Sequence, residues 1–427
     1  MARTLAQWLA WQQQQHPQAI ELGLERVREV AQRMGLLPVR VPVAIVAGTN
    51  GKGSTATTLA ALLQASGLRT GLFTSPHLVH YRERVQLAGQ CAGDADLCAA
   101  FEHIEACRAG ITLTFFEYNT LAALEVFARG AATALVLEVG LGGRLDATNI
   151  VAADVAVLCS VGMDHMDWLG DTLEDIGREK AGVFRAGQRV VLGSAAMPAS
   201  VFGHAAELGC DLCIAERDFR WSVEAGGPWR FEQGGETPLR LAPLPAPRLA
   251  GAIQYRNAAT AVAAWQALHG ARPDTIAPPT QAEAVAGLSQ VRLAGRMQVI
   301  ERGAEWILDV AHNGPAAEVL AAELRRRGTA RHTLAVFGML GDKDVRSVTQ
   351  ALEPVVDEWL LCPTDTARGL DTAQLAHRMG ATRGTQRQFA SVGDACAHAA
   401  RSAGKGDRVL VCGSFHVVGP ALHGLGL

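Results

Sequence analysis

Short apolar runs alternate along the first half of the chain with longer stretches in which apolar residues recur every three or four positions. The short runs have the length of strands buried on both faces of a sheet, and the longer stretches have the period of a helix with one apolar face. Strands are expected at residues 43–47, 70–74, 134–139, 155–160 and 189–193, and helices at residues 54–66, 120–129, 173–184 and 199–208. This alternation predicts an α/β domain in which helices cover both faces of a parallel sheet.

The pattern changes in the second half and then restarts. Residues 216–247 form short alternating pieces separated by glycines and prolines, which is typical of an antiparallel insertion. Helices are expected at residues 257–268 and 281–290, then strands at 306–310, 333–337, 358–362 and 408–412 with helices at 316–327, 345–352, 372–379 and 392–403. The sequence therefore predicts two α/β domains, residues 1–296 and a smaller one at residues 297–427.

The charge balance narrows the classes of partner. With 39 basic and 42 acidic side chains the formal net charge of the 427 residues is −3, so no strong basic field exists to hold a nucleic acid or an anionic membrane. Residues 1–15 contain no apolar stretch long enough for a signal peptide or a membrane span. Nine cysteines are too sparse for a disulfide scaffold. We expect a cytoplasmic protein that binds neither nucleic acid nor membrane.

A glycine-rich loop carries the sharpest chemical signal. Residues 48–55, GTNGKGST, follow an expected strand and open an expected helix, which is the context of a phosphate-binding loop. Glycines let backbone N–H groups turn toward an anion, and the ammonium of Lys52 can reach terminal phosphates. A standard loop has Gly where Val46 stands, and Ser or Thr where Gly53 stands. The alternative is a tight strand-to-helix turn with an incidental surface lysine.

Other polar side chains follow further strands. Glu138 ends an apolar run, and a carboxylate there can hold the divalent cation that accompanies phosphates, although it can also cap the next loop. His165, between Asp164 and Asp167, is either a metal ligand oriented by a carboxylate or a structural hydrogen-bonding residue. Residues 309–313 form another loop after a strand. By spacing alone Lys180 is an ordinary helix-surface lysine.

These motifs together resemble the folylpolyglutamate synthase and dihydrofolate synthase family, a branch of the Mur-type amide ligases. The agreement spans nearly the whole chain and follows the family's order. It includes residues 22–26, 48–55, 75–78, 83–84, 116–118, 138–149, 164–165, 178–182, 295–296, 309–313 and 412–415. One departure is Gly314, which stands where the family usually has proline, and a more flexible loop is expected there.

The resemblance implies a P-loop, Mur-ligase-like N-terminal domain and a Rossmann-like C-terminal domain, with the active site between them. It implies that Lys52, Lys180 and His312 are catalytic, with Lys180 carbamylated. The ATP site would comprise Thr49, Asn50, Gly51, Lys52, Gly53, Ser54, Asn257, Arg296 and Asp309. Magnesium (Mg²⁺) would be held by Ser75, Glu138, His165 and Lys180. The pterin would contact Thr114, Phe115, Phe116, Glu117, Leu145, Asp146 and Ala147.

The implied reaction converts a carboxylate into an acyl phosphate with ATP, after which the amine of L-glutamate displaces phosphate. The loop at residues 142–149 resembles that of family members which act on both dihydropteroate and reduced folates, so we expect a bifunctional enzyme, acting as a monomer. A peptidoglycan Mur ligase would carry a UDP-binding domain, for which the 47 residues before Gly48 are too few. A P-loop kinase, a nucleotide switch and a catalytically silent binding protein are the remaining alternatives.

Overall fold

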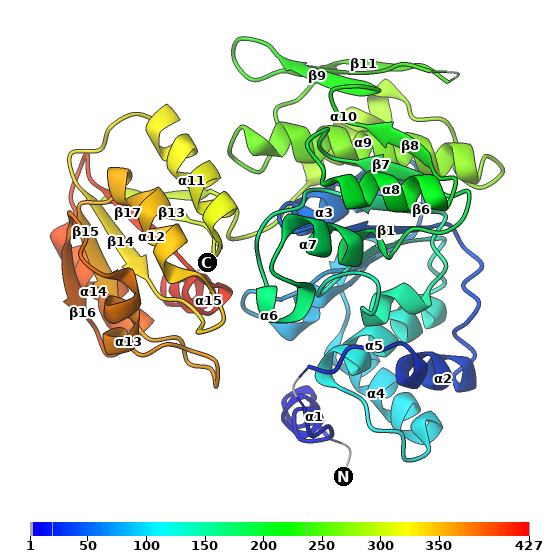
Figure 1. Ribbon diagram of the computed structural model, residues 1–427, viewed down its shortest axis with the longest axis horizontal. Coiled ribbons are helices and arrows are strands. Elements are labelled where there is room, and N and C mark those ends of the chain that lie inside the picture. Colours follow the sequence, from blue (N-terminus) through cyan, green and yellow to red (C-terminus); the bar gives the residue numbers. More distant parts are fainter. Residues whose placement is uncertain (1–2, 19, 236, 427) are drawn as a thin grey trace.

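The computed structural model describes residues 3–18, 20–235 and 237–426. Two α/β lobes lie side by side, the second one carrying helices α11 to α15 (Figure 1). This arrangement confirms the predicted fold class of two α/β units built on mainly parallel sheets. Within the described residues, no helix has both the length and the apolar character needed to cross a membrane.

The first sheet has eight strands in the order β4-β3-β2-β5-β1-β6-β7-β8. The six strands from β2 to β8 in this order are parallel, and β3 and β4 add an antiparallel edge. Their bounds are β1 Val43–Ala47, β2 Thr70–Phe73, β3 Val85–Leu87, β4 Gln90–Cys91, β5 Ala134–Glu138, β6 Val155–Leu158, β7 Arg189–Leu192 and β8 Asp211–Ile214. Because β1 lies between β5 and β6, their carboxyl ends place three polar loops next to one another.

Helices cover both faces of this sheet, as predicted (Figure 1). One face packs against α3, α9 and α10, and the other against α1, α2, α4, α5, α7 and α8. The bounds are α1 Leu5–Gln12, α2 Glu25–Arg33, α3 Lys52–Ala65, α4 Asp94–Arg108, α5 Phe115–Arg129, α6 Met166–Leu169, α7 Leu173–Ala181, α8 Ala199–Glu207, α9 Ile253–Ala271 and α10 Gln281–Gln290. Short 3-10 helices span η1 Tyr81–Arg84 and η2 Ala147–Ile150.

The predicted antiparallel insertion is a separate three-stranded sheet of β9 Phe219–Val223, β10 Trp229–Gln233 and β11 Leu239–Leu244. The second lobe is built on a six-stranded sheet in the order β12-β13-β17-β14-β15-β16, parallel except for β12. Its elements are β12 Gln298–Arg302, β13 Ala304–Leu308, α11 Gly314–Arg326, β14 Thr333–Phe337, α12 Val345–Leu352, η3 Glu353–Val355, β15 Glu358–Leu361, α13 Thr372–Met379, β16 Thr385–Gln388, α14 Val392–Ser402, β17 Arg408–Cys412 and α15 Phe415–Gly424. We propose that the domain division lies after Arg296, just before β12.

Two local expectations were wrong, those for the start of one helix and for the loop at Gly314. The helix expected from residue 120 begins at Phe115, because Thr114 and Glu117 form a capping box at its start. The glycine-rich loop after Glu138 ends in the 3-10 helix η2, which Asp146 caps. Gly314 lies in no flexible loop: it is the first residue of α11, and the side chain of Asn313 caps that helix.

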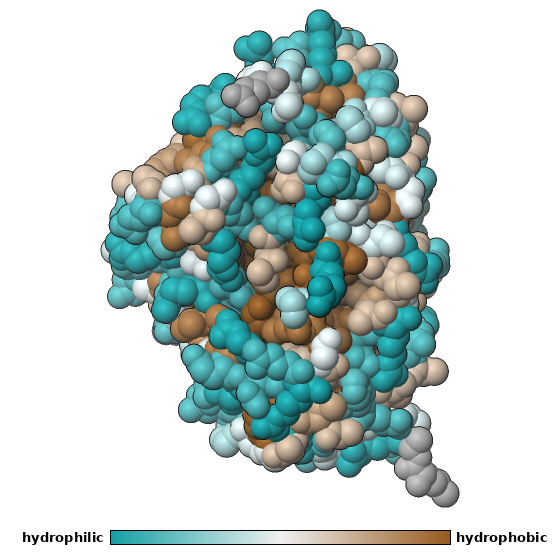
Figure 2. Space-filling model, turned by 90° about the vertical axis from the view of Figure 1, so that its right-hand side faces the viewer, coloured by the Kyte–Doolittle hydropathy of each residue, from teal (hydrophilic) through white to brown (hydrophobic). Residues whose placement is uncertain are grey.

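Apolar side chains also gather on the outer face of the first lobe. Figure 2 looks onto the side away from the second lobe and shows a brown hollow rimmed by teal side chains. Partly buried residues of this domain that pack against the cluster of α2, α4 and α5 include Leu37, Val39 and Val41. Exposed apolar atoms are normal on folded proteins, so this face by itself indicates no function.

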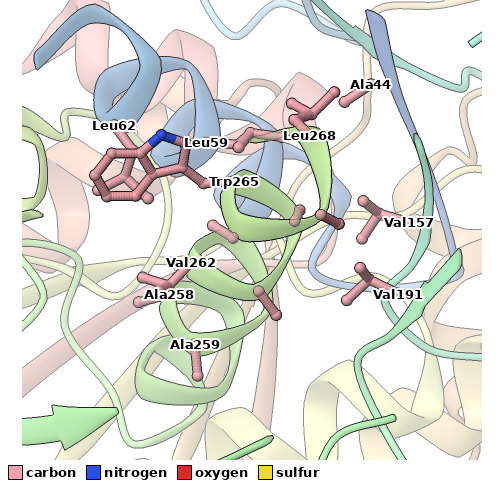
Figure 3. Packing of buried hydrophobic residues seen from close by; sticks show 14 of the residues in the cluster. Ala44, Leu59, Leu62, Val157, Val191, Ala258, Ala259, Val262, Trp265 and Leu268 are labelled. Carbon is pink, nitrogen blue, oxygen red and sulfur yellow. The ribbon is translucent and has the colours of Figure 1, made fainter. Parts of the chain in front are cut away.

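The core between the sheet and α9 is packed around one tryptophan. Trp265 is fully buried and lies beside Leu59 and Leu62 of α3, while Val157 and Val191 extend from the sheet toward the same helix (Figure 3). Because α3 is covered on several sides, ten consecutive residues from Ser54 to Leu63 are all buried. This packing fixes the helix whose first turn follows the glycine-rich loop.

We expect Trp265→Ala to lower the free energy of unfolding by about 3–5 kcal/mol, because truncating a buried tryptophan removes its apolar contacts and leaves a cavity. Denaturant unfolding followed by circular dichroism measures this change. The matched control is Trp168→Ala, since Trp168 is 43% exposed. Equal stability of the two variants would contradict the role assigned to Trp265.

Candidate active site

The glycine-rich loop joins β1 to α3 in a conformation that only glycine adopts easily. Gly51 has a φ of 89°, and a Cβ atom there would lie 2.8 Å from Oδ1 of Asn257. Backbone contacts brace the loop: Thr49 N–H donates to the Ser160 carbonyl at 2.8 Å, and Asn50 N–H donates to Ser160 Oγ at 3.0 Å. Since the N-cap residue is glycine, no side chain caps α3, and its first N–H groups can face an anion.

Two ammonium groups converge on this loop. Lys52 Nζ donates to the carbonyls of Gly48 and Thr49 at 2.9 and 3.2 Å. Lys180 Nζ, from α7, donates to the same Gly48 carbonyl at 3.1 Å. Lys180 is only 4% exposed, so its assignment as an ordinary surface lysine from spacing is wrong. Burial, assisted by the charge of Lys52, lowers the pKa of Lys180 to about 7.

Glu138 lies at the carboxyl end of β5 and faces the start of α3. Its side chain is 4% exposed, and Ser75 N–H donates to Oε2 at 3.0 Å. Burial raises the pKa of Glu138, against the opposing charges of Lys52 and Arg296. A Cβ atom on Gly53 would lie 3.6 Å from both carboxylate oxygens and 3.7 Å from Arg296 Nη2. Both are ordinary van der Waals distances, so the space around Gly53 does not by itself explain the glycine at the position where standard loops have Ser or Thr.

The nucleotide-site residues expected outside the loop lie around it. Asn257 of α9 contacts Gly51, as described above, and donates to Gln254 Oε1 at 3.0 Å. The guanidinium of Arg296 lies 5.2 Å from the ring centre of Phe415. Asp309 accepts the N–H groups of Met297 and Ala311, each at 2.8 Å. Burial raises the pKa of Asp309, with Arg296 opposing the shift.

Asp164 and His165 meet residues of the second domain. Asn313 Nδ2 donates to Asp164 Oδ2 at 2.9 Å, and His312 Nε2 lies 3.6 Å from the same oxygen. Lys343 Nζ donates to Asp164 Oδ1 at 2.5 Å and lies 3.0 Å from His165 Nε2. Although burial opposes the shift, these contacts hold the pKa of Asp164 well below its usual range. Burial also lowers the pKa of His165 to about 4, so its imidazole is neutral at pH 7.

The two domains also touch at the phosphate loop. Asn50 Nδ2 donates to Asn313 Oδ1 at 3.1 Å, and Asn313 Nδ2 lies 3.2 Å from Asn50 Oδ1. Together with the hydrogen bond from Asn313 to Asp164, these contacts bring together the loops that follow β1 and β6 in the first sheet and β13 in the second. Residues more than 200 positions apart therefore line one site.

The residues expected to contact a pterin lie at the neighbouring loop and helix start. Phe116 packs over Gly140, where a Cβ atom would lie 2.4 Å from its ring. Asp146 accepts the N–H groups of Gly140 and Leu141 at 3.0 and 2.9 Å and also caps Thr148. Asp146 therefore fixes the backbone of the loop against which Phe116 packs. Leu145 and Ala147 belong to the same segment, on either side of Asp146.

The helix start itself is held by internal contacts. The carboxylate of Glu117 accepts hydrogen bonds from Thr114 N–H at 2.7 Å and Thr114 Oγ at 2.9 Å, and it lies 3.3 Å from Arg26 Nη2. Phe115 lies beside Tyr81, with ring centres 6.3 Å apart. Thr114 and Glu117 thus position the two aromatic rings that remain partly exposed.

The sequence analysis did not predict Lys343 as a site residue, although the rarity of lysine in this chain could have indicated it. The chain has only four lysines among its 39 basic residues, namely Lys52, Lys180, Lys343 and Lys405. Three of these four lie at the site, whereas Lys405 is exposed elsewhere. All the other basic residues of this chain are arginines, so the few lysines indicate positions where a compact ammonium is needed.

Comparison with known proteins identifies both domains. The Mur ligase middle domain family matches residues 46–192, and the Mur ligase, glutamate ligase domain family matches residues 295–415. The dihydrofolate synthase/folylpolyglutamate synthase of Escherichia coli (strain K12) is 42% identical over 417 residues, covering 98% of this chain and 94% of the relative.

Solved structures agree over the full length. Escherichia coli FolC in complex with DHPP and ADP has a TM-score of 0.92 at 41% identity, covering 100% of this chain and 98% of that chain. A bifunctional folylpolyglutamate synthase/dihydrofolate synthase with Mn, AMPPNP and L-glutamate bound has a TM-score of 0.88 at 43% identity, covering 100% and 98%.

Proposed function

Because the chain belongs to the dihydrofolate synthase/folylpolyglutamate synthase family of Mur-type ligases, we propose that it joins L-glutamate to dihydropteroate and to the γ-carboxylate of reduced folates at the expense of ATP. The first reaction forms dihydrofolate and the second extends a polyglutamate tail. One observation carries the proposal: the partly buried side chain of Lys52 and the buried side chains of Lys180 and Glu138 surround an uncapped helix start of the kind that binds phosphates.

The chain's own groups account for acyl activation. A free carboxylate is a poor electrophile, so its oxygen first attacks the γ-phosphate of ATP and forms an acyl phosphate, with ADP leaving. The amine of glutamate then attacks the acyl carbon and phosphate departs. Lys52 and the N–H groups at the start of α3 stabilise charge on the phosphoryl group, and no side-chain nucleophile is required. Contacts between Asn50 and Asn313 support closure of the two domains around the acyl phosphate, which keeps water away.

The donor set suits a divalent cation. A cation bound near the phosphates would neutralise part of their charge and polarise the γ-phosphate. We assign Ser75, Glu138, His165 and Lys180 as the residues that hold it. The buried carboxylate of Glu138 and the neutral imidazole of His165 fit this assignment. Within the described ranges, no group of three or more His, Cys, Asp or Glu side chains is arranged so that it could hold a metal ion, so the assigned set depends on the hydroxyl of Ser75 and on Lys180.

We propose that Lys180 contributes as a carbamate. An ammonium repels a cation, whereas addition of CO₂ to a neutral amine gives an anionic oxygen ligand. Burial beside Lys52 favours the neutral amine that this addition requires. The resulting carbamate would place a negative charge beside the ammonium of Lys52, where the Nζ atoms of both lysines now approach one carbonyl.

The remaining ATP and substrate contacts are proposals of the same kind. Thr49, Asn50, Gly51, Gly53, Ser54, Asn257, Arg296 and Asp309 would hold ATP, and Thr114, Phe115, Phe116, Glu117, Leu145, Asp146 and Ala147 would line the pterin site. The partly exposed rings of Phe115 and Phe116 suit stacking on a flat pterin. His312 lies beside Asp164 and would hold that carboxylate in place. We further propose that the enzyme acts as a monomer, because one chain supplies all the residues assigned to the site above. We also propose that it acts in the cytoplasm.

Purified protein should release ADP only when glutamate and an acceptor carboxylate are both present. We expect turnover with dihydropteroate and, separately, with tetrahydrofolate, which coupled ADP detection and mass spectrometry of the products can measure. Glutamate-independent ADP release would instead favour a kinase or a nucleotide switch. Turnover with tetrahydrofolate but none with dihydropteroate would remove the dihydrofolate synthase half of the proposal.

A further inference from the structure

Lys343 makes a contact between the domains that the reaction described above does not use. It lies on the turn between β14 and α12, and its ammonium contacts both Asp164 and His165 of the first domain, at 2.5 and 3.0 Å. Lys343 is 9% exposed, so little water competes for these contacts. A single cation thus links the turn of one domain to two polar side chains of the other.

The contact with His165 fixes which ring nitrogen carries a lone pair. A lysine ammonium has three N–H donors and no acceptor. Its approach to His165 Nε2 at 3.0 Å therefore requires the lone pair on Nε2 and the proton on Nδ1. An imidazole binds a divalent cation through the same kind of lone pair. One nitrogen cannot serve an ammonium and a metal ion at the same time.

We propose that the ammonium of Lys343 occupies the metal-binding position of His165 in the metal-free protein, and that a divalent cation must displace it. This inference rests on the proposed function, which assigns His165 as a metal ligand. Binding of the cation and release of the Lys343 contact are then coupled. Because the contact and the bound cation are mutually exclusive, a variant that weakens the contact should bind the cation more tightly.

The turn that carries Lys343 can keep its conformation when a cation replaces the ammonium at His165. The turn is anchored within the second domain, where Gly341 N–H donates to the Arg368 carbonyl at 2.8 Å and Arg378 donates to the Gly341 carbonyl at 2.6 Å. Asp164 also keeps its hydrogen bond from Asn313. Displacement therefore requires movement of the Lys343 side chain, or of the second domain as a body.

The test compares divalent-cation binding in the full chain with AMPPNP present. Free Mn²⁺ is measured by electron paramagnetic resonance for the wild type, Lys343→Met and Lys405→Met. We expect Lys343→Met to bind Mn²⁺ at least about fivefold more tightly than the wild type, which is about 1 kcal/mol. Lys405→Met is the matched control and should stay within about twofold. Unchanged or weaker Mn²⁺ binding by Lys343→Met would overturn the inference.

A third variant separates this inference from the proposed function. His165→Ala should weaken Mn²⁺ binding if His165 is a ligand. If His165→Ala binds Mn²⁺ as the wild type does, the metal assignment itself fails, and the inference fails with it. If His165→Ala binds weakly and Lys343→Met binds as the wild type does, only the inference fails.

A measurement on the wild type covers the case in which Lys343→Met does not fold. With four lysines in the chain, ¹⁵N-lysine labelling gives few ammonium signals, and the spectrum of Lys343→Arg identifies the signal of Lys343. With AMPPNP already bound, addition of Mg²⁺ should shift or remove that signal while the signal of Lys405 stays unchanged. A Lys343 signal that is unchanged at saturating Mg²⁺ would contradict displacement.

Discussion

Replacement of Lys52 with alanine is expected to lower kcat by about 10³-fold and to weaken ATP binding. Its ammonium already lies at the phosphate loop, 2.9 and 3.2 Å from two loop carbonyls, and can turn to the phosphates when ATP binds. Removal of one preorganised charged donor from a phosphoryl-transfer site typically costs about 10²–10³-fold. Loss of the charge that also opposes the raised pKa of Glu138 adds to this effect. Steady-state kinetics and calorimetric titration with AMPPNP measure the two changes.

The control for Lys52 is Lys405→Ala, because Lys405 is an exposed lysine remote from the loop. This variant should keep the kinetics of the wild type. If Lys52→Ala kept both its ATP affinity and its turnover, the phosphate-site assignment would fall, and the loop would be a tight turn with an incidental lysine.

Lys180→Met is expected to lose activity by about 10³-fold and yet to be more stable than the wild type in CO₂-free buffer. The activity falls because no amine remains to become a carbamate ligand. Stability rises because the fold holds an amine whose pKa is about 7, against 10.5 in the unfolded chain. Between these pH values the unfolded chain binds the extra proton, so the wild type's free energy of unfolding should increase with pH, and that of the variant should not.

The activity of the wild type should depend on CO₂ and pH for the same reason. Below pH 7 the amine of Lys180 is protonated and cannot attack CO₂, so activity should rise as the pH increases through about 7 and as bicarbonate is added to CO₂-depleted enzyme. Kinetic assays over this range, with Lys405→Met in parallel, measure the dependence. Full activity in strictly CO₂-free buffer would exclude the carbamate, and so would an unmodified ammonium in crystallographic density at Lys180.

Local patterns predicted most of the fold. The bounds of β1, β14 and β17 match the expected strands, because each contains an apolar run of at least four residues and is buried throughout. The edge strands β4, β8, β12 and β16, and β3 beside β4, were missed, since they are short and none of them is buried along its whole length. An edge strand depends on the neighbour it pairs with, and its own hydrophobic pattern is weak.

The glycine-rich loop, the acidic residue at the end of a strand and the two α/β domains were all readable in the order of residues along the chain, because each depends on neighbours a few positions away. Only the folded molecule showed that Lys180 is buried against Gly48, and that Lys343 reaches Asp164 and His165. Periodicity indicates that a helix has a buried face, but it does not identify what covers that face. For Lys180 the covering group lies 132 positions away, so its low pKa and its chemistry come from tertiary packing.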